Sequence, residues 1–193
     1  MKSLILAAAL ALPATFAFAG DKYQLDSSHS QVVFSYNHLG YSTTFGMFSG
    51  FEGDIVFDQE NPTASSVNVS MPVKSMFTGW EARTGHFMSA DFFGAEDADL
   101  ITFSSTSIDV TGEKTAKITG DLTMNDKTVS VVLDAVLNQA SAYPFGDNQG
   151  VEWAGFNATT TLKRSDFGLG AFAPAVSDEV SLQISIEAKK VDS

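Results

Sequence analysis

Apolar and polar residues alternate with a period of two through most of the chain after residue 30, which is the pattern of strands that bury one face. The alternation predicts strands over 30–38, 45–57, 67–73, 117–124, 129–137, 156–164 and 180–188. Segments rich in Asn, Asp, Gly, Pro and Thr separate them and predict turns. Many antiparallel strands with one apolar face stack as a sandwich or close into a barrel, so the sequence predicts an all-β domain.

The same alternation assigns side chains to the two faces of each predicted strand. In 30–38 it places Phe34 and Tyr36 on the inner face. Across 45–57 it places Met47 and Phe51 on the inner face and Phe48 on the outer face. The chain contains 16 phenylalanines, most of which fall on predicted inner faces. A barrel of about eight strands, roughly 25 Å tall, is long enough to hold a lipid tail among them.

One long segment, 75–99, does not alternate. It holds Trp80, His86 and several phenylalanines among small and acidic residues, and we expect it to form one or two short helical turns. An excursion of this length between strands is usually functional, and we interpret it as a lid.

The first 19 residues have the pattern of a cleaved secretory signal peptide. Lys2 supplies the positive start, Leu4 to Leu12 form a short apolar run, and Ala17-Phe18-Ala19 is a small-x-small cleavage signature. The apolar run is too short to span a bilayer comfortably. We therefore expect a signal peptide over 1–19 and a single domain over 20–193.

The charge and the cysteine content of the chain exclude several classes of partner and chemistry. The chain has 11 Lys and Arg against 23 Asp and Glu, a net charge of −12 at pH 7, which argues against nucleic-acid partners and against anionic lipid surfaces. It has no cysteine, so neither a disulfide scaffold nor thiol chemistry is available. We expect no stable membrane insertion, and homodimerisation stays open.

Several segments, taken in order, resemble the YceI-like, polyisoprenoid-binding family. They are "YQLDSSHSQVVFSYNHLG", "GMFSGFEGDIVFD", "EARTGHFMSADFF", "ITFSSTSIDV", "ITGDLTMNDKTVSVVLDAVLN" and "GFNATTTLKRSDFGLG". The resemblance implies an extended antiparallel lipocalin-like β-barrel in the bacterial periplasm, with an apolar bore that takes a long isoprenoid or other lipid, and it implies no catalytic residues. Phe77 and Thr84 stand where relatives often have aspartate, so the ligand head group transfers less well than the fold.

The leading hypothesis is a periplasmic carrier of a polyisoprenoid, quinone-like or fatty-acyl lipid. We expect the head group near the lid, where Arg83 is the only cation of the segment, together with Trp80, His86 and Tyr143. We expect the tail to lie among Phe34, Tyr36, Met47, Phe51, Met71, Phe103, Leu122, Leu133, Phe156 and Leu182.

An alternative to the carrier function depends on the three histidines, His29, His38 and His86. His29 and His38 are nine residues apart, an odd separation that points them to opposite faces of an unbroken strand, so we expect no metal site and no cofactor beyond the bound lipid. The alternative function is an enzyme or redox accessory that uses His29 or His38 as acid or base on a bound quinone or lipid. A third is an interaction module with a solid core.

The signal peptide gives the first testable prediction. Intact-mass measurement of the exported protein should show a chain that begins at Gly20, because cleavage follows Ala19. A mass that still includes Met1 to Ala19 would contradict this prediction.

Overall fold

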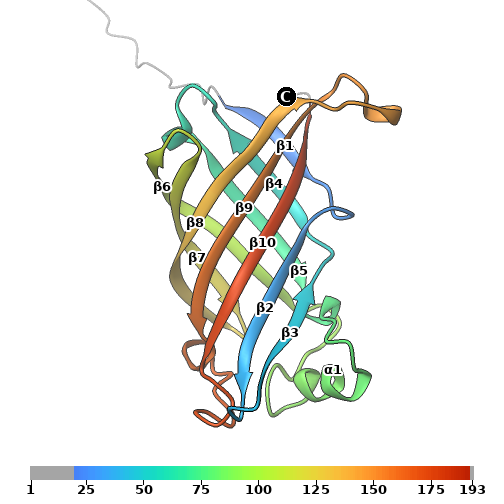
Figure 1. The fold of residues 1–193 in the computed structure, drawn as a ribbon, viewed down its shortest axis with the longest axis vertical. Coiled ribbons are helices and arrows are strands. Elements are labelled where there is room, and N and C mark those ends of the chain that lie inside the picture. Colours follow the sequence, from blue (N-terminus) through green and yellow to red (C-terminus); the bar gives the residue numbers. More distant parts are fainter. Residues whose placement is uncertain (1–19, 192–193) are drawn as a thin grey trace, which may run out of the picture.

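A computed structural model of the protein describes residues 20–191 (Figure 1). The predicted signal peptide, 1–19, lies outside the described residues. Besides short 3₁₀ turns, the described part contains one α-helix, α1 (Glu81–Met88), and ten strands. These are β1 (Asp21–Leu25), β2 (Gln31–His38), β3 (Ser42–Phe48), β4 (Glu52–Phe57), β5 (Ser66–Pro72), β6 (Leu100–Gly112), β7 (Thr115–Met124), β8 (Lys127–Ala142), β9 (Glu152–Lys163) and β10 (Glu179–Lys190).

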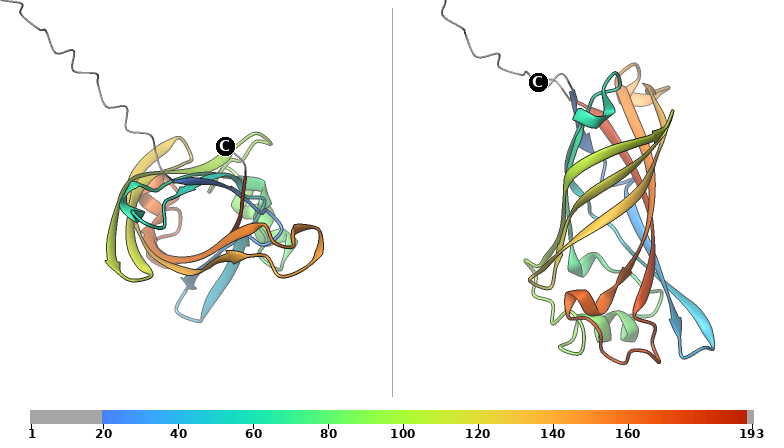
Figure 2. Two further views of the ribbon diagram at one scale, coloured as in Figure 1. Left: turned by 90° about the horizontal axis from the view of Figure 1, so that it is seen from above. Right: turned by 90° about the vertical axis from the view of Figure 1, so that its left-hand side faces the viewer.

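The sheet closes on itself because β10 pairs with two successive strands. Ala188 in its second half lies opposite Leu25 of β1, and Leu182 in its first half lies opposite Phe34 of β2. On their other side β1 pairs with β4 and β2 pairs with β3. β1 and β2 therefore share one position of the ring and β3 and β4 share another, which gives a closed antiparallel barrel of eight positions (Figure 2, left). The predicted all-β barrel of about eight strands with a short helix is confirmed.

The face prediction across 45–57 is wrong for one half of that range. Phe48 is buried in the interior, whereas Met47 points away from it. The cause is a break at 49–51, where Gly50 has a φ of +68° and separates β3 from β4. Alternation holds within a strand and does not carry across such a break, so Phe48 and Phe51 both face inward although they are three residues apart.

The tight connection of β7 and β8 follows from its sequence. Met124 and Lys127 are paired, and the two residues between them, Asn125 and Asp126, have φ of +50° and +56°. Asn and Asp tolerate this left-handed region, which a two-residue type I′ hairpin turn requires. Asn125 also donates its side-chain amide to the carbonyl oxygen of Phe167, which ties this turn to the β9–β10 connection.

The predicted non-strand segment completes the wall at the lower end of the barrel in Figure 1. β5 ends at Pro72, and the chain then runs beside β3, where Met47 and Phe77 exchange two backbone hydrogen bonds of 2.8 and 2.9 Å. α1 follows and packs Phe87 and Met88 against the barrel core. A helix of eight residues depends on such packing, since isolated helices of this length are marginal in water. No helix in residues 20–191 is long and apolar enough to cross a membrane.

At the upper end of the barrel, by contrast, a network of hydrogen bonds and ion pairs connects the strand ends. Tyr23 is fully buried, and its hydroxyl donates to Glu152, which also accepts from Gln59. Lys190 bonds to Asp21 and lies 3.8 Å from a Glu152 oxygen. Burial and the adjacent Glu152 carboxylate raise the pKa of Tyr23. These charge-assisted bonds hold the ends of β1, β9 and β10 together.

Two glycines allow a matched test of packing in the wall. A Cβ on Gly46 would lie 2.3 Å from Cζ of Phe34, the residue it pairs with, whereas a Cβ on Gly85 in α1 would meet nothing within 4 Å. Gly46→Ala should therefore lower the free energy of unfolding by about 1–3 kcal/mol. Gly85→Ala should raise it by about 0.5–1 kcal/mol, because alanine favours the helix. Urea unfolding followed by circular dichroism measures both, and changes of the same sign would contradict the packing described here.

Candidate functional site

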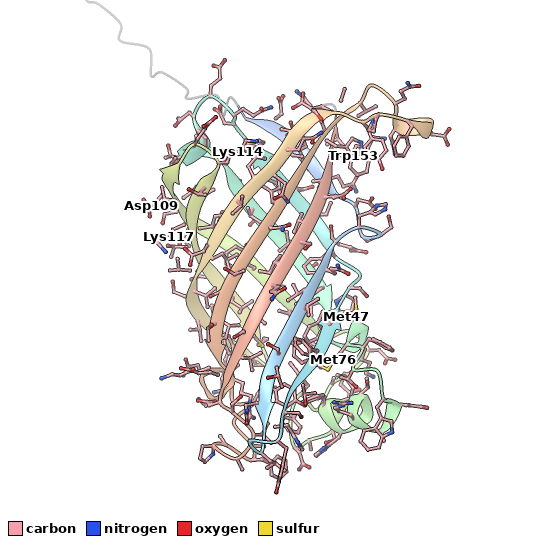
Figure 3. The ribbon with its side chains drawn as sticks, viewed as in Figure 1. Met47, Met76, Asp109, Lys114, Lys117 and Trp153 are labelled. Carbon is pink, nitrogen blue, oxygen red and sulfur yellow. The ribbon has the colours of Figure 1, made fainter. Side chains whose placement is uncertain are left out.

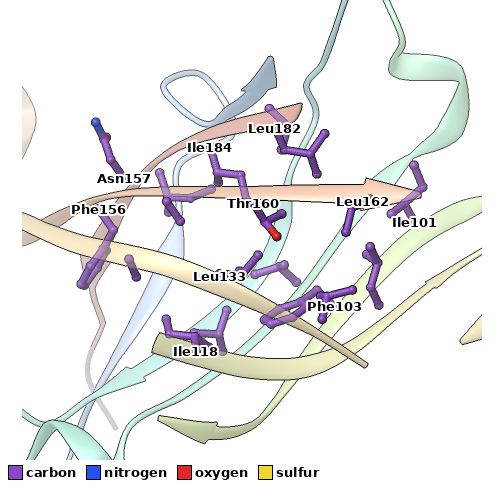
Figure 4. Close-up of a pocket in the computed structure, with 18 of the residues that line it drawn as sticks. Ile101, Phe103, Ile118, Leu133, Phe156, Asn157, Thr160, Leu162, Leu182 and Ile184 are labelled. Atoms are coloured by element: carbon purple, nitrogen blue, oxygen red, sulfur yellow. The ribbon is translucent and has the colours of Figure 1, made fainter. Parts of the chain in front are cut away.

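A cavity of about 370 Å³ occupies the inside of the barrel. Its lining comes from every strand position: Figure 4 shows side chains from β6 to β10 directed into it, among them Ile101, Phe103, Leu133, Phe156 and Ile184. The volume lies within the ~300–1,000 Å³ typical of small-molecule sites. The lining extends from the β6–β7 turn at the upper end to the α1 segment at the lower end, so the cavity follows the barrel axis.

The lining is almost entirely aliphatic and aromatic. Its charged members are Glu113 and Lys114 in the β6–β7 turn and Arg164 just after β9. Figure 3 shows Lys114 at the upper end, and Arg164 lies at the lower end of β9. The long middle section offers neither a titratable group nor a nucleophile beyond hydroxyls such as that of Thr160. Such a lining binds an apolar chain through burial alone, with polar recognition restricted to the ends.

Nine of the ten side chains predicted for the bore line this cavity: Phe34, Tyr36, Phe51, Met71, Phe103, Leu122, Leu133, Phe156 and Leu182. Met47 is the exception, and its prediction is corrected here because it lies on the outer face of β3 (Figure 3). Phe48 takes its place. That these side chains contact a ligand stays a prediction.

The predicted head-group residues do not converge. None of Trp80, Arg83, His86 and Tyr143 lines the cavity. Trp80 is 63% exposed, and the guanidinium carbon of Arg83 lies 5.9 Å from the centre of its ring. His86 bonds to Asp91 at 2.9 Å on the outside of α1. Tyr143 lies in the β8–β9 connection, at the opposite end of the barrel from α1, with its ring 4.7 Å from that of Trp153 and tilted by 40° to it (Figures 1 and 3). Trp80, Arg83 and His86 lie in the expected lid segment but do not line the cavity, and only Tyr143 lies at the other end, because sequence order does not reveal at which end of the barrel a loop lies.

Arg164 is the cation that the sequence reading missed. Its Nε and Nη2 donate to the carbonyl oxygens of Ser177 and Val176 at 2.9 and 2.7 Å, and its Nη1 donates to that of Leu169. Burial lowers the pKa of this guanidinium, which nevertheless stays charged at neutral pH. Three of its five N–H groups are used, and the side chain lines the cavity. Its position at the end of a predicted strand was the signal available in the sequence.

Aromatic residues of the α1 segment also line the cavity, namely Phe87, Phe92 and Phe93. The ring of Phe87 contacts those of Phe34 and Tyr36 edge-on at centroid distances of 6.4 and 6.0 Å. The sequence analysis noted phenylalanines in this segment, but it assigned the ligand contacts of the segment to Trp80, Arg83 and His86 instead. The segment therefore covers the lower end of the cavity with aromatic rings.

Comparison with known proteins shows to which family the chain belongs. The model of the YceI-like domain matches residues 23–188. A UPF0312 protein from Pseudomonas putida strain GB-1 is 39% identical over 189 residues, covering 95% of this chain and 96% of the relative. The chain belongs to the YceI-like family.

Solved structures share the fold of this YceI-like chain. The YceI protein of Campylobacter jejuni has a TM-score of 0.70 at 28% identity, covering 81% of this chain and 90% of its own. A polyisoprenoid binding domain from Saccharophagus degradans, implicated in plant cell wall breakdown, has a TM-score of 0.65 at 12% identity, covering 88% and 98%. The second likeness shows the fold alone.

The two histidines proposed as acid or base lie outside the cavity of the YceI-like barrel. His38 ends β2 and bridges to Val176 through its backbone. His29 lies between β1 and β2, where its Nδ1 is 2.6 Å from Asp26 Oδ2 and 3.1 Å from Ser28 Oγ. One potential ligand atom each from Asp26, His29 and Glu187 lie within 4.8 Å of one another. Because His29 already bonds to Asp26, we interpret this group as a turn cap, and the expected absence of a metal stays a prediction.

The Asp26–His29 contact predicts a measurable titration. The hydrogen bond that His29 donates to Asp26, followed by the charges of Asp26 and Glu187, raises the pKa of His29 above 6.5. Burial raises the pKa of Asp26, but bonds from His29 and Ser28 outweigh it and hold that pKa below 3.8. Because the folded-state pKa of His29 is raised, its stabilising contribution is complete below pH ~6.5 and disappears as pH rises through the folded value.

Proton NMR of the imidazole Cε1–H should therefore give a midpoint above 6.5 for His29, and Asp26→Asn should lower it. An unchanged midpoint in Asp26→Asn would show that the contact does not persist in solution.

Proposed function

We propose that this YceI-like protein is a periplasmic carrier that binds one long apolar lipid, of polyisoprenoid, quinone-like or fatty-acyl type, along the barrel axis. The observation that carries the proposal is the 370 Å³ cavity with an apolar lining from all strand positions. The barrel fold that this chain shares with a polyisoprenoid binding domain is compatible with the same class of ligand. The predicted signal peptide supports the periplasmic location.

The shape of the cavity favours a chain over a compact ligand. A strand of 12 residues such as β9, at ~3.3 Å per residue and a tilt of ~40°, spans about 30 Å along the axis. Burial is worth ~0.8 kcal/mol per CH₂, so each five-carbon isoprene unit contributes roughly 3–4 kcal/mol before ordering of the chain is subtracted. A few units suffice for micromolar to nanomolar binding.

We place the polar head group of the ligand at the lower end, beside Arg164 rather than Arg83. Arg164 lines the cavity and retains N–H groups that the protein does not use, whereas Arg83 does not line it. Guanidinium N–H groups suit a carbonyl, carboxylate or phosphate oxygen. The tail would extend upward from there past Phe103 and Phe156.

The alternative enzymatic function has no geometric support. General acid–base catalysis needs the catalytic group within hydrogen-bond reach of the substrate. Neither His29 nor His38 lines the cavity, and the lining residues include no histidine. We therefore favour carriage without chemical change of the ligand.

Two methionines provide the test. Met71 on β5 lines the cavity, whereas Met47 on β3 lies outside it. Met71→Trp puts bulk in the path of the tail and should yield a folded protein with a severalfold lower lipid load, since ligand volume is exchanged for side-chain volume. Met47→Trp adds the same bulk outside the bore and should keep the load of the parent protein. Organic-solvent extraction with mass spectrometry, alongside native mass spectrometry, measures the load.

Each other outcome is informative. An equal lipid load in parent and Met71→Trp would remove Met71 from the tail path. A parent protein without any stoichiometric apolar ligand, together with a Met71→Trp protein destabilised by about 1–3 kcal/mol through overpacking, would establish the solid-cored module instead.

A further inference from the structure

Exposed apolar side chains gather around the lower end of the barrel. Tyr41 is 89% exposed and Trp80 is 63% exposed. Four further apolar side chains here are also exposed, namely Leu39, Phe45, Phe77 and Phe172. We call these six residues the lower rim. They come from the β2–β3 hairpin, from the segment before α1 and from the β9–β10 connection. Scattered surface hydrophobic residues need no explanation, but an aromatic group collected at one end of a molecule indicates a contact surface.

Backbone contacts make the lower rim continuous. Leu39 donates its N–H to the carbonyl oxygen of Ala175 at 2.9 Å, which joins the β2–β3 hairpin to the β9–β10 connection. The Met47–Phe77 pair joins β3 to the segment before α1. Figure 1 shows these segments together at the lower end, beside α1.

The segments that carry the lower rim have no charged side chains. Lys, Arg, Asp and Glu make up 18% of the chain, yet none occurs in 27–51, 75–80 or 167–177. Charges stand at its edge: Glu81 follows Trp80 in the chain, and the guanidinium carbon of Arg83 lies 5.9 Å from the centre of the Trp80 ring. A protein with a net charge of −12 thus has at one end an apolar, largely aromatic face that is poor in charge, with Arg83 beside Trp80 and the His86–Asp91 pair beside Phe172 at its edge.

The lower rim is also connected to the cavity through aromatic rings. Phe172, which is half-exposed, lies 5.9 Å from Phe92, and Phe92 lies 5.0 Å from Phe87. Phe92 and Phe87 both line the cavity, and Phe87 contacts Phe34 on its inner wall. A row of aromatic rings therefore leads from the outer surface into the bore. His86 packs beside Phe92 and Phe172, and the guanidinium carbon of Arg164 lies 5.9 Å from the centre of the Phe92 ring.

We propose that the lower rim docks on the surface of a neutral, zwitterionic lipid bilayer, so that an apolar tail passes between bilayer and bore without exposure to water. Trp and Tyr favour the membrane–water interface, and Phe and Leu insert at the boundary between head groups and acyl chains. A face poor in charge suits a zwitterionic surface, where a cation such as Arg83 can meet a lipid phosphate, and the net negative charge of the whole chain disfavours an anionic one. This goes beyond the proposed carrier function and rests on it for its biological purpose.

Flotation with phosphatidylcholine vesicles tests the docking. Trp80→Ser and Phe172→Asn remove two rings while leaving the backbone suited to the new residue, because Ser is favoured at the helix N-cap that Trp80 occupies and Asn tolerates the φ of +63° at Phe172. The double variant should partition to vesicles at least tenfold less than the parent. Phe145→Ser is the matched control, since Phe145 is 66% exposed but lies in the β8–β9 connection at the upper end, and it should partition like the parent.

The two tryptophans give a second readout. With Trp153→Phe, Trp80 is the sole tryptophan, and brominated phosphatidylcholine should quench its fluorescence. With Trp80→Phe, the remaining Trp153 at the upper end should not be quenched (Figure 3).

Several results would overturn the proposal. They are a parent protein that does not float with neutral vesicles, equal losses in Phe145→Ser and the double variant, stronger binding to anionic than to neutral vesicles, or quenching of Trp153 alone. Sedimentation that shows a dimer abolished by the double variant, with no vesicle binding, would assign the lower rim to a second copy instead. Met71→Trp should still bind vesicles, so failure of docking and failure of lipid carriage are distinguishable.

Discussion

Closure of the sheet through β10 is the constraint on which the rest of the structure depends. A closed sheet has no free edge and removes its whole inner face from water. A barrel of eight positions is wide enough either to be filled by its own side chains or to hold one small ligand. In this barrel, glycines that pack against large aromatic rings favour an open interior over a filled one. A Cβ on Gly120 would lie 2.4 Å from Cζ of Phe103, and Gly46 accepts Phe34 in the same way. Rings packed against glycine lie along the wall and leave the axis free.

Closure also explains the lower end. Because β1 with β2 and β3 with β4 share ring positions, the chain bends twice, at 26–30 and at 49–51. Below the second bend β3 has β2 as its partner on one side and no strand on the other, since β5 ends at Pro72. The segment that follows β5 supplies the missing neighbour through Phe77 and then adds α1. The segment interpreted from sequence as a lid is therefore part of the wall as well as a cover.

The sequence predicted what local periodicity controls. Alternation within strands correctly assigned nine inner side chains, because pleating fixes side-chain direction once a strand exists. It failed at Met47, because Gly50 has a left-handed backbone conformation that interrupts the alternation. The local sequence does not show which residues face inward after this interruption. The head-group prediction failed for Tyr143, because the end of the barrel at which a loop lies depends on the direction of every preceding strand, and for Arg83, because packing decides which side of α1 faces the cavity. Arg164 was missed for the same reason, since its three carbonyl partners come from the β9–β10 connection that folds over it.

The two ends of the barrel differ in the interactions that hold them closed, and this difference gives the bore a direction. At the upper end, separation of β1 from β9 and β10 would break the bonds of Glu152 and Lys190, and breaking charge-assisted bonds leaves charges partly buried without partners. At the lower end, separation of the α1 segment from β3 would break the two backbone bonds between Met47 and Phe77, the bond from the Ser49 N–H to Ser75 Oγ, and ring packing such as that of Phe87 on Tyr36. An apolar tail or a lipid surface that takes the place of the ring restores this packing. Charged bonds at the upper end have no such apolar substitute, whereas the lower end combines ring packing with the bonds from Arg164 to the carbonyl oxygens of the β9–β10 connection.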